Sequence, residues 1–256
     1  MKTKQIFTLA FVTLTLLVTS CDKKEDDLPA PIVPPAAAAP ATINPAGSDA
    51  FGALIAIQTA NYISVPVIGE INQPVNIGVG FFGNLVGGTF VDAGDVSINT
   101  LALNKQTNNA YVYTPAATDP LGPTLSDGVT WNVTGNAANS APALNNVIPN
   151  QSFPVAPKYD GVTTIPRNAA FTVSSTIEIT GADTTYFSLY SPTTTLQKRV
   201  AGNIQSVTFT ADEMATLGAG SGYVQITPYS MTNQTFDGKK VYFINESVVT
   251  KTVTFN

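Results

Sequence analysis

Apolar and polar residues alternate over short stretches along most of the chain from residue 50 onward. This period of two is typical of β-strands, whose successive side chains point to opposite faces of a sheet. The pattern predicts strands over residues 53–57, 75–82, 129–134, 222–227, 241–243 and 247–255. In the third of these strands Val129, Trp131 and Val133 share one face, so we expect the single tryptophan to lie in the core.

Clusters of turn-forming residues separate the strands of the first half. The segment Asp92-Ala93-Gly94-Asp95 predicts a hairpin over residues 90–98. Residues 104–109 predict the turn of a second hairpin, between strands over 101–103 and 111–113. Asp92 and Asp95 offer two carboxylates, whereas Ca²⁺ takes about six to eight oxygen ligands. We therefore interpret this segment as a turn and predict no metal site in the chain.

The second half has a tighter pattern, which predicts strands over residues 171–179, 186–190, 196–200 and 204–209. A short helix follows, with Thr210 as its N-cap, Glu213 completing a capping box and Gly218 as its end. About seven short strands and one helical turn over residues 168–256 resemble an immunoglobulin-like β-sandwich. The cysteine pair that links the sheets of antibody domains is absent from this segment.

Residues 135–168 have weak periodicity and contain five prolines, so we place a domain junction around residues 150–168. The fold class we predict is all-β, with two β-sandwich modules over residues 50–157 and 158–256. A single continuous domain with a long crossover is the alternative organisation.

The N-terminal residues 1–20 have the parts of a secretory signal peptide. Lys2 and Lys4 precede an uncharged, largely apolar run of 13 residues from Ile6 to Val18. A membrane-spanning helix needs about 17–25 residues, so this run fits a signal peptide better than a membrane span. Cys21, the only cysteine of the chain, follows directly.

The residues before Cys21 carry a resemblance to a known protein class. Val18, Thr19 and Ser20 stand at the three positions of the bacterial lipobox, although Leu is more usual at the first and Ala or Gly at the third. The resemblance implies a diacylglycerol on the Cys21 sulfur, cleavage before this residue and acylation of the new amine by a fatty acid such as palmitate. Two or three long chains would hold the protein firmly at a membrane. An ordinary signal peptide with a chance cysteine is the alternative.

A charge run follows the lipidation site. Within it, Lys24-Glu25-Asp26 resembles the surface-export signal of Bacteroidota-type lipoproteins, which implies an outer-membrane protein exposed at the cell surface. Asp22 resembles instead the inner-membrane retention signal of other Gram-negative lineages, and a plain solvated charge run that keeps the tether off the membrane is a third interpretation. A periplasm-facing or inner-membrane location therefore stays open.

Residues 21–49 are predicted to be a lipidated tether. Six prolines fall between residues 28 and 46, with a run of four alanines from Ala36 to Ala39 between them. Prolines block helices and ladder hydrogen bonds, so we expect an extended chain that reaches on the order of 80 Å.

The amino-acid composition limits the functions that this chain can have. Charged residues make up 11% of the chain against about 25% in typical soluble domains, the net charge is −5, and no basic patch suggests a nucleic-acid partner. The chain has no histidine, and Cys21 is assigned to lipid. Serine–histidine and cysteine–histidine nucleophiles and histidine-bound metals are therefore excluded. We predict no enzyme and no cofactor; the alternative is a cell-envelope hydrolase that uses carboxylates only.

A group of tyrosines is our candidate binding surface. If the apolar residues of strands 186–190, 222–227 and 241–243 face the core, then the tyrosines beside them point outward: Tyr186, Tyr190, Tyr223 and Tyr242. Exposed tyrosines suit a glycan or protein ligand. Ordinary cross-strand pairing is the competing explanation. We therefore expect non-catalytic binding or structural display, with a periplasm-facing envelope scaffold as a further alternative. Asp183-Thr184-Thr185 also resembles a Bacteroidota-type O-glycosylation acceptor.

Overall fold

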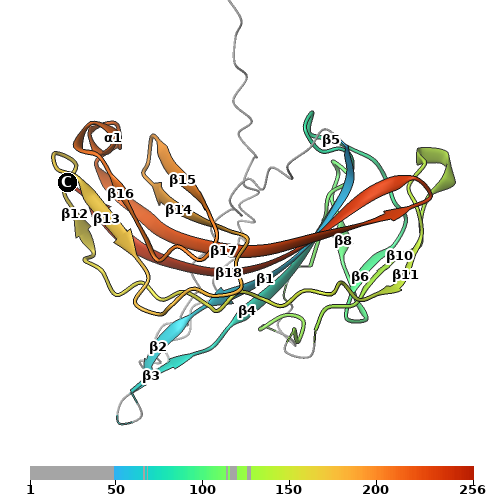
Figure 1. The fold of residues 1–256 in the computed structure, drawn as a ribbon, viewed down its shortest axis with the longest axis horizontal. Coiled ribbons are helices and arrows are strands. Elements are labelled where there is room, and N and C mark those ends of the chain that lie inside the picture. The colour runs from blue at the N-terminus through green and yellow to red at the C-terminus, as the bar shows by residue number, and fades with distance from the viewer. Residues whose placement is uncertain (1–48, 66, 68, 114, 116–119, 126–127) are drawn as a thin grey trace, which may run out of the picture. The chain divides into compact units, whose positions relative to one another are not determined.

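The computed structural model describes residues 49–65, 67, 69–113, 115, 120–125 and 128–256 (Figure 1). The described chain is almost entirely β-strand, which confirms the predicted all-β class. The exceptions are the 3₁₀ helix η1 (Ala137–Asn139) and the α-helix α1 (Ala211–Ala215).

Ten strands form the main sheet, and residues of both halves of the chain contribute to it. Eight of them follow the order β15 (Thr195–Ala201), β14 (Thr184–Tyr190), β17 (Gly220–Phe236), β18 (Lys239–Phe255), β1 (Ala50–Ala60), β4 (Val75–Asn84), β9 (Tyr111–Val112) and β8 (Asn104–Lys105). The short strands β12 (Thr164–Ile165) and β5 (Thr89–Phe90) pair with β18 and β4. Strand β1 runs parallel to β18, and the other long neighbours are antiparallel.

Three smaller sheets accompany the main one. The first has four strands in the order β11 (Leu144–Val147), β10 (Trp131–Val133), β6 (Val96–Ile98) and β7 (Leu101–Ala102). The second pairs β13 (Phe171–Ser174) with β16 (Ser206–Phe209), and the third pairs β2 (Tyr62–Val65) with β3 (Gly69–Asn72).

Strands β17 and β18 form a hairpin of two 17-residue strands that runs through the middle of the main sheet (Figure 1). Asp237 and Gly238 connect them with φ angles of +47° and +74°. Positive φ at both central residues matches the right-handed twist of paired strands, which explains the Asp-Gly sequence there.

Two hydrophobic cores lie on the same face of this hairpin. Odd-numbered residues of β18 face both of them: Val241 and Phe243 enter the first core, and Val249, Val253 and Phe255 enter the second. The first core also receives Trp131 and Ile98 from the four-stranded sheet. The second core also receives Phe209 of β16 and Met214 of α1.

A glycine sets the approach of the four-stranded sheet to the main sheet. A Cβ at Gly78 of β4 would lie 2.9 Å from a methyl group of Ile98 on β6. Such a contact is too short for ordinary packing, so only glycine admits Ile98 at this position.

The opposite face of the main sheet carries a third cluster, made of Ile55, Ile57, Val79, Tyr186, Tyr229, Ile244 and Val248. All of these residues belong to strands of the main sheet itself. The middle of the main sheet is therefore buried on both faces.

Most predicted strands and the capped helix are confirmed, but both hairpins predicted in the first half are wrong. In the hairpin predicted between residues 101–103 and 111–113, β7 pairs with β6, whereas β9 pairs with β8 and β4. The hairpin predicted over residues 90–98 is wrong in a similar way. Strand β5 pairs with β4 of the main sheet, whereas β6 pairs with β7 and β10 of the four-stranded sheet. The segment that starts at Asp92 therefore links two sheets. Side chains from other segments bind it, and it does not form a simple turn. The division into modules 50–157 and 158–256 stays a prediction.

Candidate functional site

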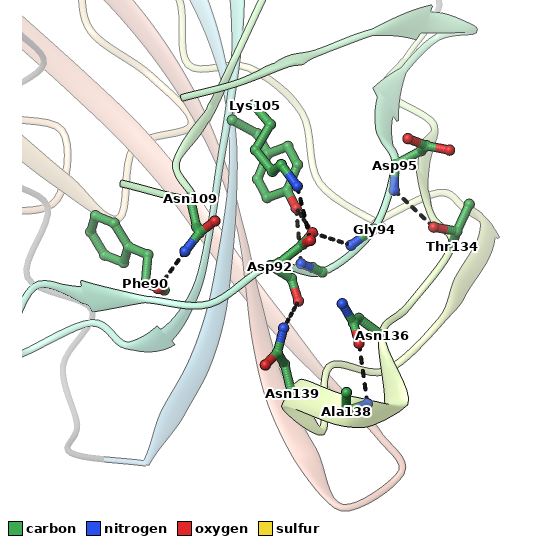
Figure 2. Close-up of polar contacts among 12 residues, drawn as sticks. Phe90, Asp92, Gly94, Asp95, Lys105, Asn109, Thr134, Asn136, Ala138 and Asn139 are labelled. Atoms are coloured by element: carbon green, nitrogen blue, oxygen red, sulfur yellow. Dashed lines mark hydrogen bonds and ion pairs between the residues drawn. The ribbon is translucent and has the colours of Figure 1, made fainter. Parts of the chain in front are cut away.

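The linking segment is held by a group of polar contacts around Asp92 (Figure 2). The Asp92 carboxylate accepts hydrogen bonds from Lys105 Nζ at 2.8 Å, the Gly94 amide at 2.9 Å and the Tyr111 hydroxyl at 2.9 Å. Lys105 first, then the Gly94 amide and the Tyr111 hydroxyl, lower the pKa of Asp92 to about 2. Its carbonyl accepts from Asn139 Nδ2 at 3.0 Å. These contacts all join protein groups that position the linking segment, so we interpret this cluster as structural.

Asp95 contacts Thr134 through its backbone: its amide donates to Thr134 Oγ1 at 2.8 Å (Figure 2), and its carbonyl accepts from the Thr134 amide at 2.9 Å. Among the residues that the structure describes, no group of three or more histidine, cysteine, aspartate or glutamate side chains is placed to hold a metal ion.

The four candidate tyrosines lie in one sheet, but the structure does not bring them together as an exposed stripe. The prediction that Tyr186 and Tyr242 point outward is wrong, since they are 4% and 5% exposed. Tyr186 stacks on Tyr229 with ring centroids 5.8 Å apart, and its burial raises its pKa. Tyr242 donates to Asp49 at 3.4 Å. Alternation could not reveal this, because the second face of the central strands is also covered.

Tyr190 and Tyr223 do lie opposite each other, on β14 and β17. Tyr223 is 36% exposed, and burial raises the pKa of Tyr190. Ligand binding by this pair stays a prediction. Tyr242 pairs with Asn233, whereas Tyr223 pairs with Thr252, so Tyr242 lies ten residues along β18 from that pair.

The lipobox residues, Cys21 and the segment Lys24-Glu25-Asp26 lie outside the described residues. The prediction of a lipid anchor and an export signal therefore rests on the sequence. In the described part of the chain, no helix has the length and hydrophobicity that a membrane crossing requires.

A band of polar side chains separates the two cores on their shared face of the main sheet. We call this set the polar band: Gln58 on β1, Asn76 on β4, Ser230 on β17, and Asn245 and Ser247 on β18. Gln58 pairs with both Asn76 and Ser247, and Ser230 pairs with Asn245, so the residues form one continuous row across four strands.

Residues 149–157, which we call the strap, pass over the polar band. The Ser230 hydroxyl donates to the Ser152 carbonyl at 2.6 Å, and the Ser247 hydroxyl donates to the Pro154 carbonyl at 2.7 Å. Asn245 Nδ2 donates to the Gln151 carbonyl at 3.5 Å. Buried polar groups need such partners, and the strap supplies them to Ser230, Ser247 and Asn245.

A cavity of about 280 Å³ remains between the strap and the polar band. Its walls combine polar and apolar residues: Gln58, Leu125, Gln151, Ser152, Phe153 and Asn245. Both side-chain polar atoms of Gln151 are buried, and neither has a hydrogen-bond partner among the described residues. Leu125 is 2% exposed and belongs to the first core, and Phe153 packs against the same core.

This cavity is the candidate functional site. It combines apolar walls with the polar residues Gln58, Gln151, Ser152 and Asn245, without a charged side chain among the described lining residues. Such a pocket can accept a small polar molecule. The sequence did not reveal it, because Gln151 lies in the weakly patterned segment that we assigned to a junction.

A buried acid lies on the opposite face of the same sheet. Glu246 of β18 is fully buried between Ile57 and Tyr229 on the neighbouring strands. Neither carboxylate oxygen has a hydrogen-bond partner among the described residues, and burial raises the pKa of Glu246 to about 8. At neutral pH this side chain is therefore mainly the uncharged acid.

Comparisons with known proteins give little further guidance. No protein-family model matches the chain, and no curated protein matches it. One solved structure, reported as insight into host cell surface retention of a 1.5-MDa bacterial ice-binding adhesin, is similar at 13% identity and a TM-score of 0.24. The match covers 82% of this chain and 66% of that chain, just under two thirds of its length. A TM-score this low supports no conclusion about this chain.

Proposed function

We propose that this protein is a lipoprotein, anchored through Cys21 in the outer membrane, whose β-sheet body binds a ligand at the cell surface without catalysis. The observation that supports this proposal best is the cavity under the strap, because its walls combine polar and apolar residues. Small-molecule sites are typically concave, with apolar walls and a few polar groups that orient the ligand.

The local chemistry favours binding over a carboxylate-only hydrolase. Hydrolysis of a glycosidic bond needs two carboxyl groups on either side of the scissile bond. The described residues that line the cavity include no carboxylate, and the buried acid Glu246 lies on the other face of the sheet.

The location is tested by comparing the wild-type chain with Cys21→Ser in the native host. We expect the wild type to sediment with outer membranes and to be cut when intact cells are treated with a protease. The Cys21→Ser variant should leave the membrane fraction. A variant that stays with the membranes would contradict the anchor, and a wild type that resists protease on intact cells would favour a periplasm-facing scaffold.

The binding role is tested by applying the full-length protein to an array of glycans and surface proteins. We expect at least one ligand whose signal is lost in Gln151→Ala. The matched control is Gln234→Ala, which changes an exposed glutamine on β17 that does not line the cavity. Signals that are equal in all three proteins would contradict a role for the cavity.

A further inference from the structure

Strand β1 connects the predicted tether to the rest of the described body. It lies in the middle of the main sheet, parallel to β18 from Ala50 to Ala60 and antiparallel to β4 from Gly52 to Thr59. The segment predicted to be the lipidated tether, residues 21–49, ends directly before it. A pull on the tether therefore reaches the body through β1.

Asp49 fastens the start of β1 to β18. Its carboxylate forms an ion pair with Lys240 and accepts a hydrogen bond from the Tyr242 hydroxyl at 3.4 Å. Lys240 is also the register partner of Ala50. The first residues of the strand are therefore held by side chains as well as by the sheet.

The two ends of the body set the direction of a pull. The chain enters beside Lys240, near the start of β18, and reaches Asn256 after the far end of the same strand. Figure 1 places the C-terminus at the end of the hairpin away from its turn. About 50 Å of strand separates the two points, at about 3.3 Å per residue. A pull between the tether and the C-terminal end therefore runs along the strands.

This direction loads the pairing of β1 in its strongest geometry. Hydrogen bonds between neighbouring strands run across the strand axis. A force along the axis therefore strains all the bonds of β1 at once, and many must break together. A force across the strands opens the same bonds one after another from one end, so it needs to be much smaller.

Side-chain packing opposes sliding of β1 in the same direction. A Cβ at Gly52 would lie 2.9 Å from the ring of Phe82, so only glycine fits there. Moving β1 by two residues toward its N-terminus would bring Leu54 to this place, because alternate side chains share a face. Leu54 is fully buried, and its present position lies against Gly80 of β4. The strand must therefore separate from its neighbours before it can slide.

We propose that the pairing of β1 with β18 and β4 is a mechanical clamp, which keeps the body folded when the tether and the C-terminal end are pulled apart. A surface protein that holds a ligand while its anchor is fixed in a membrane carries such a load. The use of the clamp by the cell rests on the proposed anchor at Cys21, whereas the resistance itself depends on the strands alone.

Single-molecule force spectroscopy tests the clamp on the full chain, produced without lipid so that Cys21 keeps a free thiol. Cys21 is the only cysteine and serves as one handle. Asn256→Cys supplies a second handle that loads β1 along the strands. Thr235→Cys, at an exposed position of β17 opposite Lys240, loads it across them. At one pulling speed we expect rupture along the strands to need about twice the force or more, since forced unfolding is governed by the unfolding rate.

Two controls separate direction from stability. Both variants should unfold at the same urea concentration as the wild type, because both substituted positions are exposed. Gln234→Cys places the handle one residue away on β17, opposite Val241, and should break at the same low force as Thr235→Cys.

The outcomes distinguish the clamp from the proposed function. Equal rupture forces in the two directions would overturn the clamp and leave the anchor untouched, because fractionation of Cys21→Ser tests the anchor separately. A higher force along the strands, combined with a Cys21→Ser variant that stays with the membranes, would support the clamp and overturn the anchor.

Discussion

At the scale of single residues, the fully buried carboxyl of Glu246 is the most unusual feature of the described chain. Its neighbours Ile57 and Tyr229 offer it no hydrogen bond, so the ionised form is strongly disfavoured and its pKa rises from 4.5 to about 8. The unfolded chain would lose its proton near the ordinary value, whereas the folded chain keeps it. The folded state therefore binds more protons between these two pKa values.

We predict that this difference makes stability fall as pH rises. The contribution of Glu246 is fully present below about pH 4.5 and is lost progressively up to about pH 8, on the order of 4 kcal/mol for a displacement of this size. Glu246→Gln keeps a neutral side chain of similar shape and should remove most of this dependence. Urea unfolding at pH 5 and pH 8 measures both effects.

Other titrations interfere little between pH 5 and pH 8. The chain has no histidine, and four described carboxyls have lowered pKa values: Asp49, Asp92, Asp160 and Glu213. The control is Glu178→Gln, which changes an exposed carboxylate and should keep the wild-type dependence on pH. Equal stability of the wild type at pH 5 and pH 8 would show that the Glu246 carboxyl reaches water or an unseen partner.

Tyr111 gives a second prediction at this scale. Its hydroxyl accepts from the Ala93 amide at 2.9 Å and donates to Asp92 at 2.9 Å, and both Tyr111 and Ala93 are buried. Tyr111→Phe would leave the Ala93 amide unsatisfied, so we expect a loss of about 1–3 kcal/mol in the free energy of unfolding. Urea denaturation measures it. Tyr223→Phe, at a position 36% exposed, should change stability by less than about 0.5 kcal/mol.

Alternation along the sequence predicted one face of each strand better than the other. Trp131, Phe187 and Leu189 are buried as expected, at 1%, 0% and 0% exposure. The assumption that the remaining face meets solvent failed at Tyr186 and Tyr242, because the second face of the middle strands is buried as well. A period of two identifies two faces, but it does not show how many of them are covered.

At the scale of elements, α1 is the clearest agreement between sequence and structure. Thr210 Oγ1 accepts from the Glu213 amide at 3.2 Å, and the Glu213 carboxylate accepts from the Thr210 amide at 2.7 Å. The same motif places Met214 and Leu217 in the second core, at 0% and 1% exposure. A capping box is a local signal, so the sequence alone could reveal it.

We predict that Thr210→Ala destabilises the protein by about 1 kcal/mol, since it removes the N-cap of a helix that contributes to the second core. Thermal unfolding followed by circular dichroism measures the effect. The control Thr235→Ala lies at an exposed position of β17 and should leave the midpoint unchanged. An equal shift in both variants would mean that the cap itself contributes nothing.

The long strands are where the element predictions failed. Residues 241–243 and 247–255 were predicted as separate strands, but β18 continues from Lys239 to Phe255. The gap in the pattern, residues 244–246, contains Asn245 and Glu246, which are buried polar residues in the structure. Asn245 belongs to the polar band, so a residue that hid the length of the strand also lines the candidate site.

At the scale of the whole described body, two cores share one sheet. Its central hairpin presents Phe243 to the first core and Val249 to the second, and the polar band lies between them. The cavity combines Gln58, Leu125, Gln151 and Asn245, which come from four separate stretches of the chain. No local sequence pattern predicts such a site, because only tertiary contacts bring these residues together.

The shared sheet leads to a prediction about the proposed modules 50–157 and 158–256. A fragment of residues 50–157 lacks β18, and with it both Val241 and Phe243 of the first core and the parallel partner of β1. We expect this fragment to be unfolded alone, because losing two fully buried side chains and the strand beside β1 removes several kcal/mol from a small net stability. The fragment 158–256 keeps β14, β17, β18 and α1, and loses only Ala60 of the buried second-core residues, so it should retain more structure.

NMR spectra of each fragment, and of the two mixed, show whether the fragments fold, because a folded chain has well-dispersed amide signals. We expect the mixture to recover the spectrum of the intact body, since β1 can pair again with β18 from Gly52 to Ala60. A well-dispersed spectrum from residues 50–157 alone would mean that the first core closes without the hairpin. The two halves would then be independent modules, and the pairing of β1 with β18 would be an interface between them and not a requirement for folding.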